Sequence, residues 1–368
     1  MITNKGMTVE SLAVSAPGRI CLFGEHQDYL GLVVIAAAID RRIFIRGRRR
    51  EDLAASFDLP DTGETDAFSL GRDVPYLKDR DYLRSAANVL RRSGADSPCG
   101  WDLHVRGSIP INAGTSSSSA LVVAWVRFLL EAAGDARAGD PAAVAELAYL
   151  SEVAEFGEPG GRMDHYASAL GGVLRMRFIE PTTISPLPTP PGAFVLGNSL
   201  EKKDTTGMLA RIKSGVRRGE TEAGGRIPGF SLRSALTDEV EAVISRLDSD
   251  AARLLKAALL NRDLTEEGAR LFSEDTFDDI RFGALLSRQQ KILRDGLGIS
   301  TPRIDGMIDV ALASGALGAK INGSGGGGCM FAYAPGRAEV VAEAVRRTGA
   351  EAVVVRIDEG VRREPPAS

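Results

Sequence analysis

Apolar positions along the chain follow the spacing of strands in some segments and the spacing of helices in others. Apolar, partly β-branched or alternating runs predict strands over residues 33–45, 101–105, 173–178, 194–197, 329–333 and 352–357. Apolar residues at helical spacing predict helices over 82–90, 121–130, 142–156 and 338–346, and a mainly helical stretch over 232–297. Strands and helices are therefore expected in both halves of the chain.

Turn-rich stretches interrupt this pattern. Pro17-Gly18 predicts a turn inside an apolar segment, and residues 51–75 are polar with turn residues. The stretch 182–192 is rich in proline and threonine and is the best candidate for a domain boundary. The segment 222–230, with three glycines and a proline, predicts a mobile loop.

Composition narrows the class of protein. The 368 residues are 44% hydrophobic and 26% charged, with a formal net charge of −4, which is typical of a globular protein and argues against a nucleic-acid partner. The six arginines within residues 41–50 are interpreted as a solvated edge strand and turn. Three widely spaced cysteines predict no disulfide framework. With no signal peptide and no long apolar run, we expect a soluble cytoplasmic protein without a membrane partner.

The most unusual stretch is I-P-I-N-A-G-T-S-S-S-S-A-L, residues 109–121. Serine is a favoured helix N-cap, but four serines in a row exceed what one cap needs. A helix N-terminus offers free N–H donors and partial positive charge to a phosphate, and hydroxyls can bind Mg²⁺. We interpret the stretch as a cradle for nucleotide phosphates; the alternative is a flexible serine-rich loop.

Two further stretches concentrate polar residues. Gly24 and Gly31 bracket a cluster with Glu25, His26 and Asp28, which is either a ligand loop or an ordinary charged turn. The run G-G-R-M-D-H-Y breaks a predicted helix and presents Asp164, a residue type that commonly caps helices in such a position.

A glycine-rich stretch, A-K-I-N-G-S-G-G-G-G-C-M-F-A-Y, covers residues 319–333. Gly323, Gly325 and Gly328 have the spacing of the dinucleotide-binding fingerprint, but a strand-like run follows where that fingerprint needs a helix. We therefore reject the Rossmann interpretation. Glycines this dense indicate close approach to another backbone or ligand, or else a tight hairpin.

Three of these stretches resemble, in the right order, the three motifs of the GHMP kinases, the superfamily of galactokinase, homoserine kinase, mevalonate kinase and phosphomevalonate kinase. They are P-G-R-I-C-L-F-G-E-H-Q-D-Y, P-I-N-A-G-T-S-S-S-S-A-L and N-G-S-G-G-G-G-C. G-E-H-Q-D-Y is similar to the galactokinase signature, and G-R-M-D-H-Y looks like the galactokinase segment with the catalytic aspartate. Ser-Thr-Pro at 300–302 looks more like mevalonate kinase.

The resemblance implies an α+β fold with two domains. Residues 1–185 would form a ribosomal protein S5 domain 2-like α/β domain. Residues 186–368 would form a ferredoxin-like GHMP kinase domain, with the active site in the cleft between the two. It also implies ATP and Mg²⁺ as cofactors, a small-molecule sugar as substrate, and a monomer or homodimer.

Site roles follow from the resemblance position by position. Asp164 matches the catalytic base, and Arg19 matches an arginine that would keep it ionised and offset charge on the phosphoryl group. The substrate-binding positions are Glu25, His26, Asp28, Tyr29 and Arg162. The nucleotide-binding positions are Gly114, Thr115, Ser116, Ser117, Ser118, Ser119, Gly323, Gly325 and Gly326. Ser118 and Glu152 are chosen as the Mg²⁺ ligands, with Glu155 close enough to be confused with Glu152.

The sequence departs from the galactokinase pattern at several positions. Cys21 replaces asparagine, Thr115 replaces an apolar residue, Gly160 and Arg162 replace cysteine and isoleucine, and His165 replaces glutamine. No tyrosine matches the one that closes over the sugar from the second domain. Because Arg162 would add a positive charge near the sugar, an acidic sugar such as a uronate is one hypothesis.

The function expected is an ATP- and Mg-dependent kinase that phosphorylates a monosaccharide at its anomeric hydroxyl by direct in-line transfer. Galactose leads among the acceptors, with a uronic acid, arabinose or a heptose as alternatives. Two further hypotheses are a mevalonate kinase-like enzyme and a catalytically silent sugar- and ATP-binding regulator. Asp164, Arg19 and Glu152 argue against the regulator, since a sensor needs no base.

Overall fold

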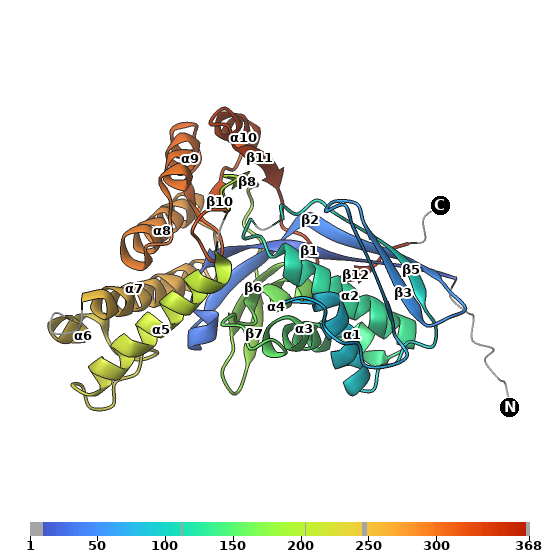
Figure 1. The fold of residues 1–368 in the computed structure, drawn as a ribbon. Coiled ribbons are helices and arrows are strands. Elements are labelled where there is room, and N and C mark those ends of the chain that lie inside the picture. Colours follow the sequence, from blue (N-terminus) through green and yellow to red (C-terminus); the bar gives the residue numbers. More distant parts are fainter. Residues whose placement is uncertain (1–9, 112, 203, 245–248, 366–368) are drawn as a thin grey trace.

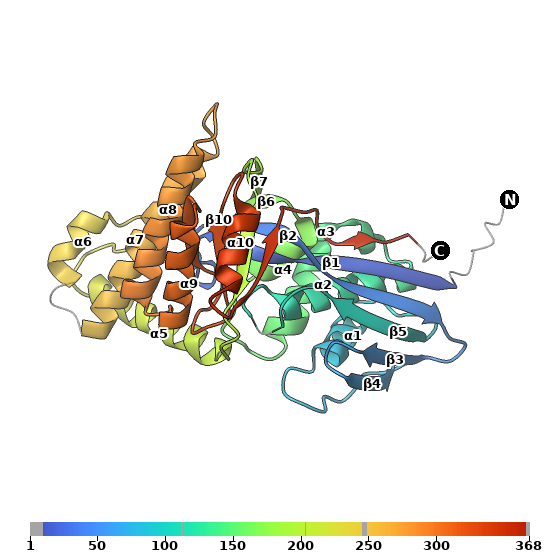
Figure 2. The same ribbon diagram turned by 90° about the horizontal axis from the view of Figure 1, so that it is seen from above.

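The computed structural model describes residues 10–111, 113–202, 204–244 and 249–365, which form two sheets with their helices (Figure 1). The eight-stranded first sheet has the order β12-β1-β2-β5-β3-β4, with β6 on β2 and β7 on β6. Its strands are β1 (Ser11–Phe23), β2 (Val34–Arg49), β3 (Ala54–Leu59), β4 (Glu64–Ser69), β5 (Trp101–Gly107), β6 (Val173–Arg177), β7 (Thr183–Leu187) and β12 (Arg362–Arg363). The long strands β1 and β2 run along most of the molecule (Figure 2).

Four helices cover one face of the first sheet (Figure 1). They are α1 (Tyr82–Arg92), α2 (Ser117–Ala133), α3 (Pro141–Tyr149) and α4 (Met163–Leu170), and a π-helical turn, Leu150–Ala154, follows α3. The 17-residue α2 is apolar on most of its faces because it is the central helix of this layer. Its Trp125 and Phe128 rings lie 5.0 Å from Phe57 and 5.1 Å from Trp101, respectively. The first sheet and these helices are called the first unit below.

The second unit contains a four-stranded antiparallel sheet with the order β11-β8-β10-β9. Its strands are β8 (Phe194–Asn198), β9 (Gly318–Ile321), β10 (Cys329–Tyr333) and β11 (Glu351–Val355). Its helices are α5 (Thr205–Gly224), α6 (Thr237–Ile244), α7 (Ser249–Leu271), α8 (Asp279–Lys291), α9 (Pro302–Ala313) and α10 (Ala338–Arg346), with a π-helical turn at Ile292–Leu297. The strand order, with helices between β8 and β9 and between β10 and β11, is the ferredoxin-like arrangement predicted from the sequence.

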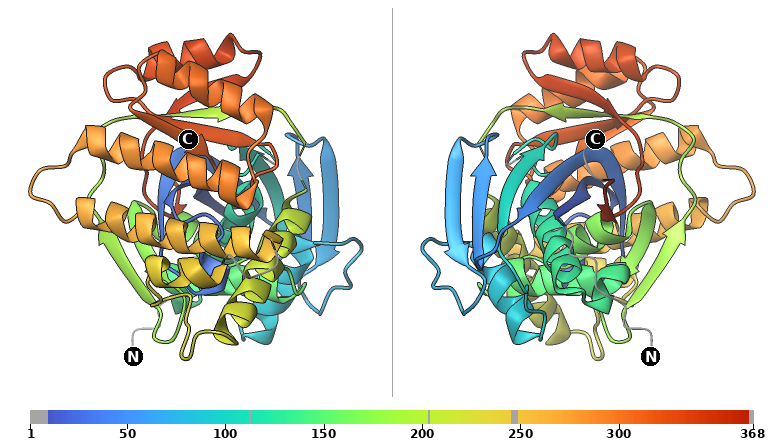
Figure 3. Two further views of the ribbon diagram at one scale, coloured as in Figure 1. Left: turned by 90° about the vertical axis from the view of Figure 1, so that its left-hand side faces the viewer. Right: turned by 90° about the vertical axis from the view of Figure 1, so that its right-hand side faces the viewer.

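The two units share a hydrophobic core. Phe23 and Ile35 of the long strands pack with Phe194 and Phe282 of the second unit, and the rings of Phe23 and Phe282 lie 5.7 Å apart. Viewed end-on, the second sheet with α9 and α10 lies above the curved first sheet, and the helices of the first unit lie below it (Figure 3). This shared core fixes the relative position of the segments that meet in the cleft between the units.

The chain passes from the first sheet to the second between β7 and β8, within the proline- and threonine-rich stretch 182–192. It then returns to the first sheet at its end, where Ile357 bridges to Ile39 and β12 pairs with β1. The short strand β12 near the C-terminus thus belongs to the first sheet. The division at residues 185 and 186 stays a prediction, and it falls inside β7.

Two expectations about the first strands are wrong. Strand β1 continues through Pro17-Gly18 without a turn, although its pairing with β2 is irregular there. A Cβ atom on Gly18 would lie 2.8 Å from the carbonyl oxygen of Thr115, so glycine at this position permits close approach of the serine-rich loop. The Pro17-Gly18 pair that predicted a turn therefore marks a close contact between β1 and the serine-rich loop.

The arginine tract belongs to an interior strand, because β2 pairs with β1, β5 and β6. Arg42 is only 4% exposed, and its guanidinium pairs with Asp358 at 2.7 Å and donates to the hydroxyl of Ser15 at 2.8 Å. The edge-strand interpretation is therefore wrong at this position. A long arginine side chain ties the returning C-terminal segment to the first sheet.

Three other segments differ from the expected pattern. The polar stretch 51–75 contains the β3–β4 hairpin, and α5 extends to Gly224, into the predicted loop 222–230. The predicted helix 142–156 is α-helical only to Tyr149 and then widens into the π-helical turn. In the part of the chain that the structure describes, no helix has the length and apolar character needed to cross a bilayer.

Candidate active site

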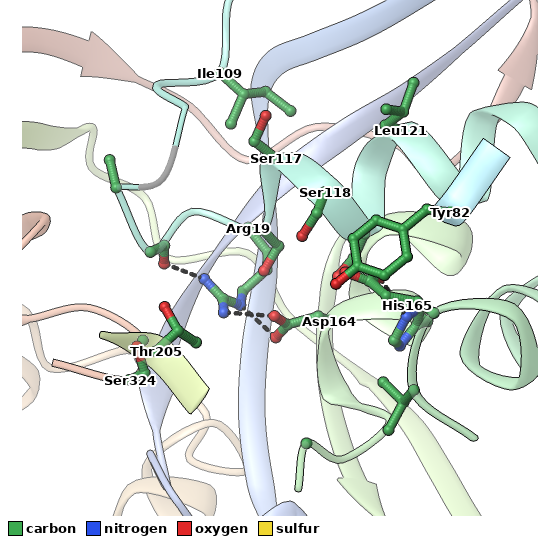
Figure 4. A pocket seen from close by; sticks show the side chains of 18 of the residues that line it. Arg19, Tyr82, Ile109, Ser117, Ser118, Leu121, Asp164, His165, Thr205 and Ser324 are labelled. Carbon is green, nitrogen blue, oxygen red and sulfur yellow. Dashed lines mark hydrogen bonds and ion pairs between the residues drawn. The ribbon is translucent and has the colours of Figure 1, made fainter. Parts of the chain in front are cut away.

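A cavity of about 400 Å³ opens between the two units. The first unit supplies Arg19 of β1, Ile43 of β2, the loop between these strands, the N-terminal turns of α2 and α4, and the β3–β4 hairpin. The second unit supplies Thr205 and Leu209 of α5 and Gly323 and Ser324 of the β9–β10 loop. Figure 4 shows Arg19 between the Ser117–Ser118 turn on one side and Thr205 and Ser324 on the other. We call this cavity the main pocket.

A bidentate ion pair between Arg19 and Asp164 lies in the main pocket (Figure 4). Arg19 Nε and Nη2 donate to Asp164 Oδ1 and Oδ2, both at 2.8 Å, and Nη1 donates to the carbonyl of Gly114 at 2.5 Å. The Arg19 side chain is only 5% exposed, whereas that of Asp164 is 28% exposed. The guanidinium of Arg19 is thus fixed by the three hydrogen bonds that it donates, and the carboxylate of Asp164 remains partly exposed to the pocket.

Burial raises the pKa of the Asp164 carboxyl, but the charge of Arg19, with the interactions of Ser116 and the hydrogen bonds of Arg19, more than offsets this and holds that pKa below its ordinary value. Asp164 also lies in the first turn of α4, where the helix dipole favours a negative charge. Asp164 is therefore ionised at neutral pH and can accept a proton.

Four serines lie in the lining of the main pocket. Ser116 has a positive φ of 60°, and α2 begins at the next residue. Ser116, Ser117, Ser118 and Ser119 all line the pocket, as does Gly114. Thr115 does not line it: the side chain is buried, and its hydroxyl donates to the carbonyl of Pro110 at 3.4 Å. The pocket thus contains a helix N-terminus with small hydroxyl side chains, which suits phosphate.

The glycine-rich loop between β9 and β10 packs against the serine-rich loop. Asn322 donates from Nδ2 to the carbonyl of Gly114 at 2.8 Å and accepts from the backbone N–H of Cys21 at 2.9 Å. Gly323 has a φ of 78°, and a Cβ on it would lie 2.7 Å from the carbonyl oxygen of Gly114. Asn322, in the third sequence motif, is therefore hydrogen-bonded to both the first and the second motif.

Of the three glycines of this loop that were predicted to bind nucleotide, Gly323 lines the main pocket, whereas Gly325 and Gly326 contact Ile299. The N–H of Gly326 donates to the carbonyl of Ile299 at 2.7 Å. Gly325 and Gly326 thus hold the glycine-rich loop against Ile299 and do not line the pocket. The structure agrees with the rejection of a Rossmann motif, because the glycine run leads into strand β10.

A further part of the main pocket, called the acidic end below, has Glu25, His26, Asp28 and Tyr29 in its lining. His26 Nδ1 lies 2.6 Å from the hydroxyl of Tyr29, and Asp28 Oδ2 accepts from the backbone N–H of Met163 at 3.2 Å. Burial raises the pKa of Asp28, and the charge of Asp164 raises it further. The four predicted residues therefore lie together in one part of the pocket.

Glu25 is held by a buried cation. Lys320 of β9 forms an ion pair with Glu25 Oε1 and donates to the carbonyl of Cys21 at 2.9 Å, and both side chains are at most 1% exposed. Burial raises the pKa of Glu25 although Lys320 opposes the shift. Glu25 Oε2 has no hydrogen-bond partner among the described residues. A buried acceptor of this kind is costly unless a ligand donates to it.

The predicted metal ligands Ser118 and Glu152 both line the main pocket. Glu155 does not: it binds Arg92 at 2.6 Å and the hydroxyl of Tyr76 at 2.5 Å on the surface. Glu152 Oε2 lies 2.7 Å from His165 Nε2, which leaves the other carboxylate oxygen available. Among the described residues no group of three or more metal-ligating acids, histidines or cysteines occurs. Ser118 and Glu152 still fit Mg²⁺, which commonly takes one or two protein ligands beside phosphates and waters.

Arg162 is not brought together with the other predicted substrate residues. Its guanidinium pairs with Glu146 through two contacts of 3.0 Å and lies 4.1 Å from the centre of the Tyr149 ring. It is absent from the lining of the main pocket. A carboxylate of the protein already neutralises Arg162, so its charge gives no ground for an acidic sugar.

Several lining residues were not predicted from the sequence. The β3–β4 hairpin brings Leu59, Asp61 and Thr62 to the pocket. Arg80 comes from the segment before α1, and Tyr82 is the first residue of that helix. Leu59 belongs to an apolar slot, which is completed by Ile43, Val105, Ile109, Ile111 and Leu121. The period-two pattern of A-A-S-F-D-L, followed by P-D-T-G, was a usable hairpin signal.

Comparison with known proteins identifies the family of this chain. The GHMP kinases N terminal domain matches residues 81–172, and GHMP kinases C terminal matches residues 255–351. The Galactokinase galactose-binding signature matches residues 6–49. The chain belongs to the GHMP kinases and is an ATP-dependent kinase.

Relatives from two branches of this family match the chain. A galactokinase of Pasteurella multocida is 30% identical over 88% of this chain and 86% of its own length. A mevalonate kinase of Pyrococcus furiosus is 29% identical over 95% of this chain and 97% of its own length.

Two solved structures share the fold. Lactococcus lactis galactokinase in complex with galactose has a TM-score of 0.84 and 22% identity, and the match covers 97% of this chain and 96% of that one. Methanococcus jannaschii mevalonate kinase has a TM-score of 0.72 and 18% identity, over 96% of this chain and all of that one. The predicted two-domain α+β fold class is thereby confirmed.

Proposed function

We propose that this protein phosphorylates a monosaccharide at its anomeric hydroxyl, with ATP as the donor. The observation that carries the proposal is the ionised Asp164, held by Arg19 in the same pocket as the N-terminus of α2. An ionised carboxylate within reach of a helix N-terminus suits transfer of a phosphoryl group to a hydroxyl.

The acceptor binds at the acidic end of the pocket in this proposal. Carboxylates accept hydrogen bonds from hydroxyls, and an imidazole accepts or donates them. Asp28 and Glu25 line this part of the pocket, and Glu25 Oε2 has no hydrogen-bond partner among the described residues. Asp164 takes the proton from the attacking hydroxyl, while Arg19 keeps the carboxylate ionised and offsets negative charge on the transferring group. The reaction is a single in-line displacement, in which the enzyme acts mainly by positioning its substrates.

The nucleotide binds toward the serines. The N–H groups and hydroxyls at residues 116–119 hold the phosphates, and the apolar slot accepts the adenine base. Ser118 and Glu152 hold Mg²⁺, which supplies charge neutralisation to the phosphates when bound.

Mevalonate is the second candidate acceptor, because mevalonate kinases match 95% or more of the chain. The composition of the pocket favours a sugar. Its acidic end has two carboxylates and His26, which suit a ligand with several hydroxyls, whereas mevalonate, a branched carboxylic acid, has few. A silent regulator is disfavoured by the retained Arg19–Asp164 pair.

The proposal is tested by ADP release with Mg-ATP across galactose, arabinose, galacturonate, mannose, a heptose and mevalonate. We expect turnover with one sugar, reduced about 10²- to 10⁴-fold in Asp164→Asn, because a general base contributes that much. The substitution Asp61→Asn serves as the control, because Asp61 lines the same pocket but its carboxylate accepts from the backbone N–H of Gly107 rather than from Arg19. Turnover of mevalonate alone, or full activity in Asp164→Asn, would refute the proposal.

A further inference from the structure

A second cavity, of about 310 Å³, lies behind the acidic end of the main pocket. Both cavities have Asp28, Tyr29, Gly160 and Gly161 in their walls. The wall is thin at the two glycines, which have no side chains. Position 161 has no room for a side chain, because a Cβ there would collide with the carboxylate of Asp28. A ligand at Asp28 is thus next to both cavities.

Four cations line the second cavity: Arg162, Lys213, Arg217 and Arg233. The structure neutralises two of them, since Arg162 pairs with Glu146 and Arg217 pairs with Glu220 at 2.5 Å. Lys213 and Arg233 differ: within the described ranges, neither has a carboxylate at ion-pair distance. Lys213 Nζ lies 3.4 Å from the carbonyl of Pro159 and 5.6 Å from the centre of the Tyr29 ring.

The charges facing the cavity therefore do not balance. The carboxylates in its lining are Asp28 and Glu220, and Glu220 is already paired with Arg217. Asp28 accepts from a backbone N–H on the side of the main pocket. Lys213 is half-buried, so its charge is less well hydrated than on an open surface, and an anion in the cavity would offset part of that loss.

We propose that the second cavity binds an anionic group, a carboxylate or a phosphate, carried by the acceptor itself. The acceptor is then a sugar acid or a sugar phosphate whose hydroxyls contact Asp28 while its anionic group reaches Lys213 and Arg233. The inference rests on the proposed sugar kinase activity and adds the class of substrate. It assigns the charge selectivity to Lys213 and Arg233 rather than to Arg162, which Glu146 neutralises.

The test compares KM and kcat for galactose, galacturonate and galactose 6-phosphate in the native chain and in Lys213→Gln and Arg233→Gln. Arg218→Gln is the matched control, because Arg218 lies on the same helix but outside the cavity. We expect an anionic acceptor to have the lower KM. Each variant should raise that KM about tenfold, as for one charged hydrogen bond, and leave kcat and the KM for galactose unchanged. A lower KM for galactose, or equal effects of Arg218→Gln, would overturn the inference.

Inorganic phosphate distinguishes an anion on the acceptor from a free anion. Competition with the anionic acceptor that is lost in Lys213→Gln supports the inference. An effect of phosphate on galactose turnover without competition against the anionic acceptor means a free effector, and overturns it.

A failure of the proposed function would be recognised separately. If only mevalonate is turned over, the sugar assignment fails, and an unchanged KM for mevalonate in Lys213→Gln overturns the anion site as well. If nothing is turned over, calorimetry of the native chain with galacturonate and galactose decides. Tighter binding of galacturonate that depends on Lys213 supports the site, and equal binding refutes it.

Discussion

The Asp164 side and the Asp28 side of the main pocket each present a carboxylate, and their surroundings act in opposite directions. Burial raises the pKa of both carboxyls. At Asp164 the charge of Arg19, with the interactions of Ser116 and the hydrogen bonds of Arg19, reverses the shift, whereas at Asp28 the charge of Asp164 adds to it. One side is thus prepared to accept a proton, and the other to exchange hydrogen bonds with a ligand.

Glu25 shows that a cation alone does not produce a strong acid. Lys320 pairs with it, yet its pKa is raised, because the carboxyl is almost completely buried. Asp164 combines a bidentate arginine with an open face toward the pocket. We infer that both features are needed for the predicted base.

The largest effect is expected when Glu25 loses its cation. Lys320→Met leaves a buried carboxylate unpaired and should lower the free energy of unfolding by about 3–5 kcal/mol in denaturant titrations at pH 7. The double variant Glu25→Gln/Lys320→Met should recover most of that loss. Equal losses in the single and double variants would show that the ion pair is not the cause.

The next effect concerns the geometry at Asp164. Arg19→Lys keeps the positive charge but loses the fork that binds both carboxylate oxygens, so kcat should fall about 10²-fold in single-turnover measurements. Arg42→Lys, at a buried arginine outside the pocket, should affect stability but not kcat. A kcat within twofold of the native value in Arg19→Lys would show that charge alone suffices.

A smaller effect is expected at the metal ligands. Glu152→Gln should raise the Mg²⁺ concentration for half-maximal rate on the order of tenfold, because one charged oxygen ligand is lost. Glu155→Gln, which lies outside the pocket, should leave the Mg²⁺ dependence unchanged. The opposite ranking would transfer the metal to Glu155.

The smallest effect is the pH dependence of stability, and its sign differs between the two aspartates. The lowered folded pKa of Asp164 adds stability above its unfolded pKa of about 3.9, and this is lost as the pH falls through the folded value. The raised folded pKa of Asp28 adds stability below about 3.9, and this is lost as the pH rises through the folded value.

Denaturant titrations between pH 3 and 7 check this difference. Relative to the native chain, Asp28→Asn should become more stable as the pH rises, and Asp164→Asn should become less stable. Parallel curves for the two variants would mean that their surroundings do not differ as described.

Much of the fold was predictable, because the longest apolar runs are buried elements. Helix α2 and strand β2 lie where the pattern placed them. The pattern failed where a residue serves a tertiary contact. Gly18 mimics a turn but allows the approach of Thr115, and Arg42 mimics an exposed edge but binds the returning C-terminal segment.

The site was predictable where one short motif carries several of its residues, as in 116–119 or 25–29. The site was less predictable where single residues from distant segments contribute to it. Lys320 and Asn322 stand in the glycine-rich stretch, but their partners, Glu25 and the carbonyl of Gly114, are about 300 and 200 residues away in sequence. A lysine within a strand-like apolar run was the one available signal for the buried ion pair.

The most direct test of the account is the titration of the two carboxyls themselves. Aspartate labelled with carbon-13 at the carboxyl allows each group to be followed by NMR, with Asp164→Asn and Asp28→Asn to assign the signals. We predict that Asp164 titrates below the ordinary range of aspartate, that Asp28 titrates above it, and that Arg19→Gln raises the pKa of Asp164. If Asp164 titrates at or above Asp28 in the native chain, Arg19 does not hold it as an ionised base, and the account of the site is wrong.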